Sequence, residues 1–151
     1  MTTERAARPG RALGVDLGAR RIGIAVSDSA GTLATPRSTL QRTGDAERDR
    51  RALVDLAVEE EAVVVVVGHP LSLDGSRGPA ARAAEAEAEA LTELLTGRGV
   101  AVELFAERLP TVSAHQALTA GGTRGRDQRA VVDKTAAAIL LTAWLDARRA
   151  S

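Results

Sequence analysis

The chain has 151 residues, enough to bury the core of one domain, which we place at residues 11–149 behind a flexible arm at residues 1–10. Its 20 basic and 20 acidic residues balance, so no net charge draws it to nucleic acid or to a membrane. The absence of cysteine excludes disulfides and thiolate metal sites, and the only aromatic residues, Phe105 and Trp144, argue against a base-stacking platform. No segment has the pattern of a signal peptide or a membrane span, so we expect a cytoplasmic protein.

The first third of the chain predicts strands. Apolar residues that alternate with small ones predict one strand at residues 12–16 and a second at residues 22–28, joined as a hairpin. A short third strand is expected at residues 32–35, ending at Pro36 because proline has no N–H for a strand ladder. Asp16 then stands near the end of the first strand.

The middle of the chain alternates helices with buried strands. A helical pattern starts at Asp45, and the β-branched run at residues 62–67 predicts a strand covered on both faces, ending at Gly68. After a loop of small residues, Pro79 opens a second helix that ends near Gly97.

The last third begins with an apolar strand at residues 100–105. A short helix at residues 111–120 follows, and then a mobile loop rich in glycine and arginine at residues 123–129. The final helix, at residues 130–149, carries one apolar stripe, which places Asp133 in its first turn.

This order of elements predicts an α/β fold. The sheet is mixed and five-stranded, with three antiparallel strands followed by two parallel ones, and helices flank it. Right-handed crossovers put the fourth strand beside the first. The carboxyl ends of the first, fourth and fifth strands then open on one side, where α/β sheets place their sites.

Three acids can meet on that side: Asp16, Glu107 after the fifth strand, and Asp133. Converging carboxylates repel one another unless a cation neutralises them, and oxygen ligands favour Mg²⁺ or Mn²⁺. Two such ions about 4 Å apart hydrolyse phosphodiesters in other enzymes. Each acid also has a simpler explanation: a turn residue for Asp16, an exposed strand end or an ion pair for Glu107, and a helix N-terminus for Asp133.

Further residues near these acids are suited to bind a nucleic-acid backbone. Arginines bind phosphate in a bidentate manner, and a loop of small residues before a helix N-terminus favours phosphate. For Arg20, Arg21 and Arg108 the simpler explanation is an ion pair with a nearby acid. For Arg124 and Arg126 it is a solvated connecting loop. The candidates are Arg20, Arg21, Ser72, Arg108, Arg124 and Arg126.

Several segments carry a resemblance to a known family: LGVDLG at residues 13–18, RIGIAVSD at 21–28, VGHPLSLDGS at 67–76, ERL at 107–109 with TV at 111–112, and VDKTAA at 132–137. In these the chain resembles the YqgF/RuvX family of bacterial RNase H-like nucleases, also called Holliday junction resolvases or pre-16S rRNA nucleases. The resemblance spans residues 12–146. It implies an RNase H-like fold, a cytoplasmic location and divalent-metal nuclease chemistry, with Asp16, Glu107 and Asp133 as the acidic triad.

Ala106 departs from that family, which has an aspartate directly before the glutamate, and Pro110 replaces a small polar residue. If Glu107 is the metal ligand, Ala106 removes only a supporting group; if the missing aspartate binds metal, activity is weak or absent.

The leading hypothesis is a metal-dependent endonuclease acting on structured RNA, at the 5′ end of precursor 16S rRNA. A Holliday junction resolvase, which would act as a homodimer on branched DNA, is the nearest alternative. A catalytically impaired nucleic-acid-binding module is another. An actin-like ATPase is a fourth hypothesis, although such enzymes need two lobes and this chain provides one.

Overall fold

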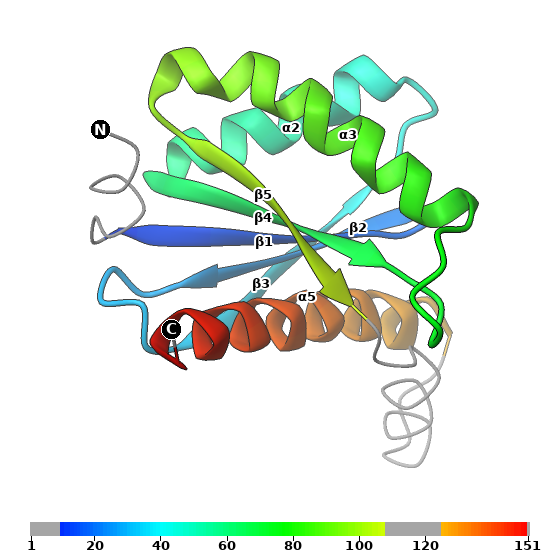
Figure 1. Ribbon diagram of the computed structural model, residues 1–151. Coiled ribbons are helices and arrows are strands. Elements are labelled where there is room, and N and C mark those ends of the chain that lie inside the picture. Colours follow the sequence, from blue (N-terminus) through cyan, green and yellow to red (C-terminus); the bar gives the residue numbers. More distant parts are fainter. Residues whose placement is uncertain (1–9, 108–124, 151) are drawn as a thin grey trace.

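The computed structural model describes residues 10–107 and 125–150, with side chains for residues 10–107 and 134–150. Its elements form a central sheet with helices on both faces (Figure 1). They are β1 (Arg11–Leu17), β2 (Arg21–Ser27), β3 (Ala34–Gln41), α2 (Ala46–Glu59), β4 (Ala62–Pro70), α3 (Pro79–Leu95), the 3₁₀ turn η1 (Thr96–Arg98), β5 (Ala101–Glu107) and α5 (Gly125–Ala150).

The sheet has the order β3-β2-β1-β4-β5. β1 and β2 are antiparallel, as are β2 and β3, whereas β4 runs parallel to both β1 and β5. The expected mixed sheet, with the fourth strand beside the first, is therefore confirmed. β1, β4 and β5 end on the same side of the molecule (Figure 1).

The starts of helices α2 and α3 are set by residues at their amino-terminal ends. Asp45 caps α2 by accepting hydrogen bonds from the backbone N–H groups of Glu47 and Arg48, at 3.1 and 3.3 Å. Pro79 opens α3, a position at which its missing N–H costs no hydrogen bond. Both helix starts agree with the sequence.

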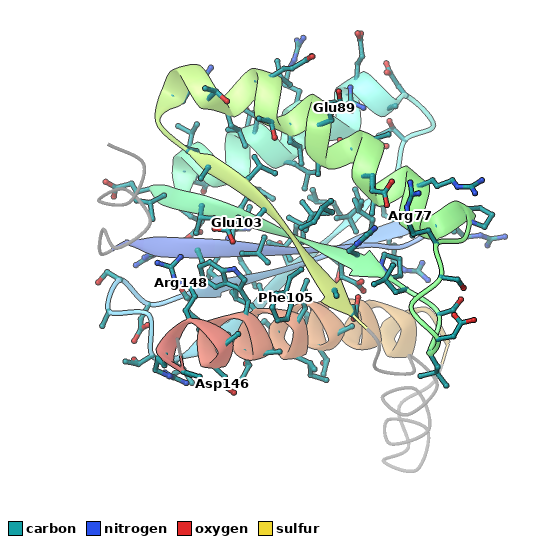
Figure 2. All side chains as sticks on the ribbon, in the orientation of Figure 1. Arg77, Glu89, Glu103, Phe105, Asp146 and Arg148 are labelled. Atoms are coloured by element: carbon teal, nitrogen blue, oxygen red, sulfur yellow. The ribbon has the colours of Figure 1, made fainter. Side chains whose placement is uncertain are left out.

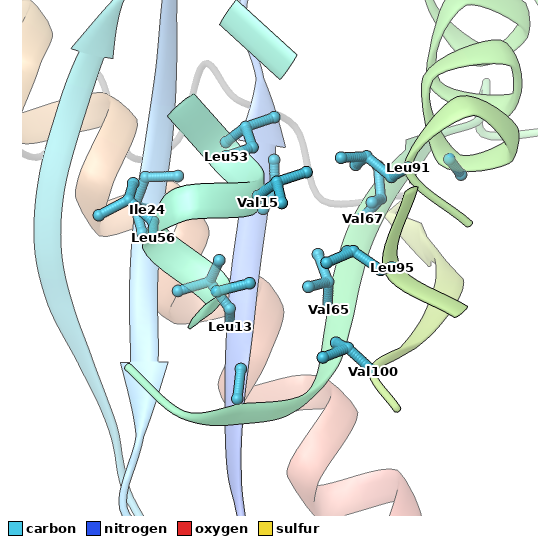
Figure 3. Close-up of a cluster of buried hydrophobic side chains, with 14 of the residues drawn as sticks. Leu13, Val15, Ile24, Leu53, Leu56, Val65, Val67, Leu91, Leu95 and Val100 are labelled. Atoms are coloured by element: carbon cyan, nitrogen blue, oxygen red, sulfur yellow. The ribbon is translucent and has the colours of Figure 1, made fainter. Parts of the chain in front are cut away.

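Helices α2 and α3 cover one face of the sheet, and α5 covers the other (Figure 1). β4 contributes to both resulting cores because its valines alternate in direction: Val65 and Val67 face α2 and α3, and Val64 and Val66 face α5. The strand predicted to be covered on both faces is confirmed. Figure 3 shows the α2–α3 core, which includes Leu13, Val15, Ile24, Leu53, Leu56, Leu91, Leu95 and Val100.

The helix α5 approaches β1 closely at Gly14. A Cβ atom on this glycine would lie 3.0 Å from Cβ of Leu141 and 3.2 Å from the carbonyl oxygen of Ala137. The predicted apolar stripe of α5 is buried against the sheet at this point, which confirms it. The stripe consists of Ala137, Leu140, Leu141, Trp144 and Leu145.

Three predicted strand ends are wrong. β5 extends to Glu107, two residues beyond its expected end, because it pairs with β4 as far as Pro70. β3 runs from Ala34 to Gln41 and passes through Pro36, because β3 is an edge strand of the sheet and a bulge at Arg37 interrupts the ladder there. β4 continues beyond Gly68 to Pro70, because β5 pairs with it over this whole length.

The expected loop at residues 123–129 is also wrong for residues 125–129, which belong to α5. Local composition favoured a loop because glycine is a poor helix former, but the long helix extends through this glycine and arginine stretch. Asp133 is therefore the ninth residue of α5, in its third turn and not its first. The expected helix at residues 111–120 lies outside the described residues.

Over the described part of the chain, no helix is both long and apolar enough to cross a membrane.

Candidate active site

Asp16 lies on the α5 side of the sheet, near the carboxyl end of β1. Gly14, two residues earlier, contacts α5, and alternate residues of a strand face the same side. Asp16 pairs with Gly23 of β2 across the hairpin. The turn of this hairpin is tight, since the N–H of Gly18 donates to the carbonyl of Arg21 at 2.9 Å.

Glu107 is the last residue of β5, opposite Pro70 of β4. Phe105, two residues earlier, packs in the core beneath α5 (Figure 2), so Glu107 shares the α5 side with Asp16. The backbone carbonyl of Glu107 accepts a 3.3 Å hydrogen bond from the N–H of Leu71. This bond ties the end of β5 to the start of the loop after β4.

The two carboxylates influence each other electrostatically. Burial raises the pKa of Glu107 to about 7, and the negative charge of Asp16 contributes to the increase. A pKa of about 7 leaves Glu107 partly protonated at neutral pH, whereas an isolated glutamate would be fully ionised. A divalent cation between the two groups would remove the repulsion and favour both ionised forms.

The position of Asp133 along α5 follows from the contacts of that helix. Leu140 lies seven residues, or about two turns, after Asp133 and contacts the surface of β4 at Gly68. The amino-terminal part of α5 therefore extends past the end of β4, and α5 also contacts β5 (Figure 1). The side chain of Asp133 lies outside the described ones, and no group of three potential metal ligands occurs among the side chains that are described.

Three of the predicted backbone-binding residues lie near the two carboxylates or on segments joined to them. Arg20 is exposed in the β1–β2 turn, and Arg21 begins β2 on the side of the sheet that Asp16 occupies. Ser72 is exposed and follows Leu71, which is bonded to Glu107.

Of the other three predicted backbone-binding residues, one lies in a described helix and two lie outside the described residues. Arg126 belongs to the first turn of α5, so its expected place in a mobile loop is wrong. Arg108 and Arg124 lie outside the described residues.

The loop that carries Ser72 is held in place at both ends. Besides the bond from Leu71, Arg77 donates to Glu85 of α3 at 2.7 Å, and Nε2 of His69 lies 2.6 Å from the same carboxylate. Both partners hold the pKa of Glu85 down, at about 2. Figure 2 shows Arg77 beside the start of α3.

Ala106 faces away from the carboxylate pair. It stands opposite His69 in the β4–β5 register, and neighbouring strand residues point to opposite faces. An aspartate at this position would lie on the α3 side, next to His69, and not beside Asp16 and Glu107. The geometry thus favours a supporting role for the group that Ala106 lacks.

The sequence pattern placed Gly68 at the end of the fourth strand and did not assign it to the site of the acids. A Cβ atom on Gly68 would lie 2.9 Å from Oε2 of Glu107 and 3.2 Å from Cδ2 of Leu140. The available signal was a glycine directly after a run of valines in a strand, which marks a close approach of other atoms.

The sheet order and the cover of one face by α5 are those of an RNase H-like fold. The chain belongs to the RuvX family, described as "Holliday junction resolvase", which matches residues 10–147. Members of this family are nucleases, which hydrolyse phosphodiester bonds.

Relatives from several bacteria carry the name "Putative pre-16S rRNA nuclease". One from Mycobacterium sp. (strain KMS) is 46% identical over 142 residues, covering 94% of this chain and 83% of the relative. Another from Anaeromyxobacter dehalogenans (strain 2CP-C) is 47% identical over 138 residues, covering 91% and 98%.

Among solved structures, Thermus thermophilus RuvC is similar with a TM-score of 0.54 and 16% identity, over 93% of this chain and 96% of that one. The same protein in complex with a Holliday junction substrate has a TM-score of 0.54 and 17% identity. At this identity the likeness supports the fold.

Proposed function

We propose that this protein is a metal-dependent endonuclease whose Mg²⁺ or Mn²⁺ ions are held by Asp16, Glu107 and Asp133. The observation that carries the proposal is the carboxylate pair, in which burial and the charge of Asp16 raise the pKa of Glu107 to about 7. A cation offsets such repulsion, and an all-oxygen donor set suits these two ions. We assign the activity to the domain at residues 11–149.

The chain's own groups have defined tasks in this chemistry. The bound ions would lower the pKa of a water molecule and stabilise the leaving oxygen. Glu107 would release its proton to solvent on binding an ion near neutral pH, and Asp16 would keep the pair negative. Arg20, Arg21 and Ser72, with Arg108, Arg124 and Arg126, hold the backbone of the nucleic acid.

The proposed substrate is precursor 16S rRNA, cleaved at its 5′ end in the cytoplasm. Relatives with 46 and 47% identity over most of this chain are named for that substrate. The match covers 94% and 91% of this chain in the two relatives, a length that includes the strands carrying Asp16 and Glu107, which supports a shared reaction.

The second candidate is resolution of Holliday junctions, which the description of the matching family favours. A resolvase makes paired cuts in two strands and would require a homodimer. The same three acids would then act on branched DNA.

The deciding experiment compares two labelled substrates under identical conditions with Mn²⁺. One is an RNA with the 5′ extension of precursor 16S rRNA, and the other is a four-way DNA junction. Cleavage of the RNA at a defined 5′ position, with the junction left intact, is the expected result. Paired cuts in the junction alone would favour the resolvase, and binding of either substrate without cleavage at any Mn²⁺ concentration would favour a binding module.

A further inference from the structure

Three strands contribute to the space around the carboxylate pair. β4 lies between β1 and β5, so Asp16 and Glu107 can interact only across β4. Val15 pairs with Val67, which puts Gly68 alongside Asp16, and Gly68 pairs with Phe105, two residues before Glu107. Gly68 is therefore the β4 residue between the two acids.

The side chain of Glu107 extends back over this glycine. Its Oε2 atom lies 2.9 Å from the point that a Cβ atom of residue 68 would occupy, closer than real Cβ atoms approach other groups. The carbonyl oxygen of Val15, the residue before Asp16, lies 3.7 Å from the same point. A methyl group here would clash with the Glu107 carboxylate.

We propose that Gly68 is a positioning residue of the active site: its missing side chain leaves the space in which the Glu107 carboxylate lies beside Asp16. The inference deepens the proposed function and rests on it for the catalytic consequence, but the placement of the carboxylate is a property of the metal-free protein.

The backbone does not require a glycine at this position. The glycines with positive φ within the described residues are Gly31, Gly44, Gly75 and Gly99, and Gly68 is not among them. An alanine could adopt the same strand conformation, and it would make the unfolded chain less flexible than a glycine does. A conformational reason for this glycine is therefore lacking.

Close packing of α5 is another reason that residue 68 would have to be glycine. The distances distinguish it from the need to leave space for the carboxylate. Cδ2 of Leu140 is 3.2 Å from the same point, which a shift of a few tenths of an ångström relieves. The carboxylate at 2.9 Å is the more severe contact, and it is the end of a flexible side chain that can turn away. An added methyl group thus displaces the carboxylate before it displaces the helix.

The test is Gly68→Ala, with Gly97→Ala as the matched control because a Cβ atom at Gly97 has no neighbour within 4 Å. The first measurement is the ¹³C resonance of the Glu107 carboxyl in the metal-free protein, which we expect to shift in Gly68→Ala and not in the control. The second is Mn²⁺ affinity by calorimetry, expected to fall about tenfold or more with the melting temperature retained. The third is kcat on the RNA substrate, expected to fall at least as much while KM changes by less than about threefold.

A second variant separates positioning from packing. If the contact with Leu140 were the reason for the glycine, Gly68→Ala would lower the melting temperature, and adding Leu140→Ala would restore Mn²⁺ affinity. We expect no such restoration, so recovery in the double variant would overturn the inference.

An unchanged Glu107 resonance and wild-type Mn²⁺ affinity in Gly68→Ala would also overturn it. If the proposed function itself were wrong, the wild-type protein would neither bind Mn²⁺ nor cleave the RNA, which distinguishes that outcome from failure of this inference. The resonance measurement tests the placement of the carboxylate in that case as well.

Discussion

The carboxyl group of Glu107 and that of Asp16 lie on the same side of the sheet and interact across β4, with a glycine between them. The charge of Asp16 adds to burial in raising the pKa of Glu107 to about 7. A protein keeps such a repulsive pair at a cost in stability, so the pair is a candidate for function and not for folding.

The first prediction concerns this electrostatic coupling. Asp16→Asn removes the negative charge but keeps the shape of the side chain, so the pKa of Glu107 should fall towards its ordinary value while staying above it because of burial. A titration of the Glu107 carboxyl ¹³C signal in the metal-free protein measures this. An unchanged pKa in the variant would mean that the two groups do not interact.

The second prediction concerns stability as a function of pH. The folded-state pKa of Glu107 is raised above its ordinary value of 4.5, so between about pH 4.5 and 7 the unfolded chain loses this proton first. Stability therefore falls as pH rises through that window. Glu107→Gln, which cannot ionise, should be more stable than the wild type at about pH 8, by up to about 3 kcal/mol.

Chemical denaturation with a chelator present gives this comparison, and at about pH 4 the difference should disappear because the glutamate is protonated in both states. A variant less stable than the wild type at the higher pH would contradict the raised pKa.

The third prediction concerns metal affinity. A ligand that still carries a proton at neutral pH must release it when a metal binds. The Mn²⁺ affinity should thus rise by up to about tenfold per pH unit below about pH 7 and level off above it. Calorimetry in buffers of different ionisation enthalpy would detect the released proton. Affinity that does not depend on pH across this range would argue against Glu107 as a ligand.

The fourth prediction concerns Ala106, which faces the α3 side of the sheet opposite His69. Ala106→Asp should change kcat/KM by less than about threefold, because the new carboxylate would point away from Asp16 and Glu107. A gain of a hundredfold or more would show that this position takes part in the metal site.

Much of the fold follows from local patterns in the sequence. The alternation in β1 and β2, the valine run of β4 and the cap at Asp45 each give the correct element, and right-handed crossovers then fix the sheet order. Errors arose where the rest of the structure overrides local preference. An edge position and a bulge accommodate Pro36 in β3, and α5 begins at Gly125, within a stretch whose composition favours a loop.

The site was predictable to the extent that its residues carry charge. Asp16 and Glu107 could be placed at strand ends from the sequence, and the structure brings them together. The raised pKa of Glu107 was not predictable, since it depends on burial in the folded protein and on the nearby charge of Asp16. Gly68 has no functional group, so its part in the site emerges only from distances.

We propose that Asp16 and Glu107 belong to one metal-dependent cleavage site. The most direct test of this proposal is single-turnover cleavage of the precursor RNA with Mn²⁺ by the wild type and by Asp16→Asn, with folding monitored by circular dichroism. We expect a rate loss of about a thousandfold or more in a variant that melts no lower than the wild type. Cleavage at the wild-type rate by folded Asp16→Asn would contradict it.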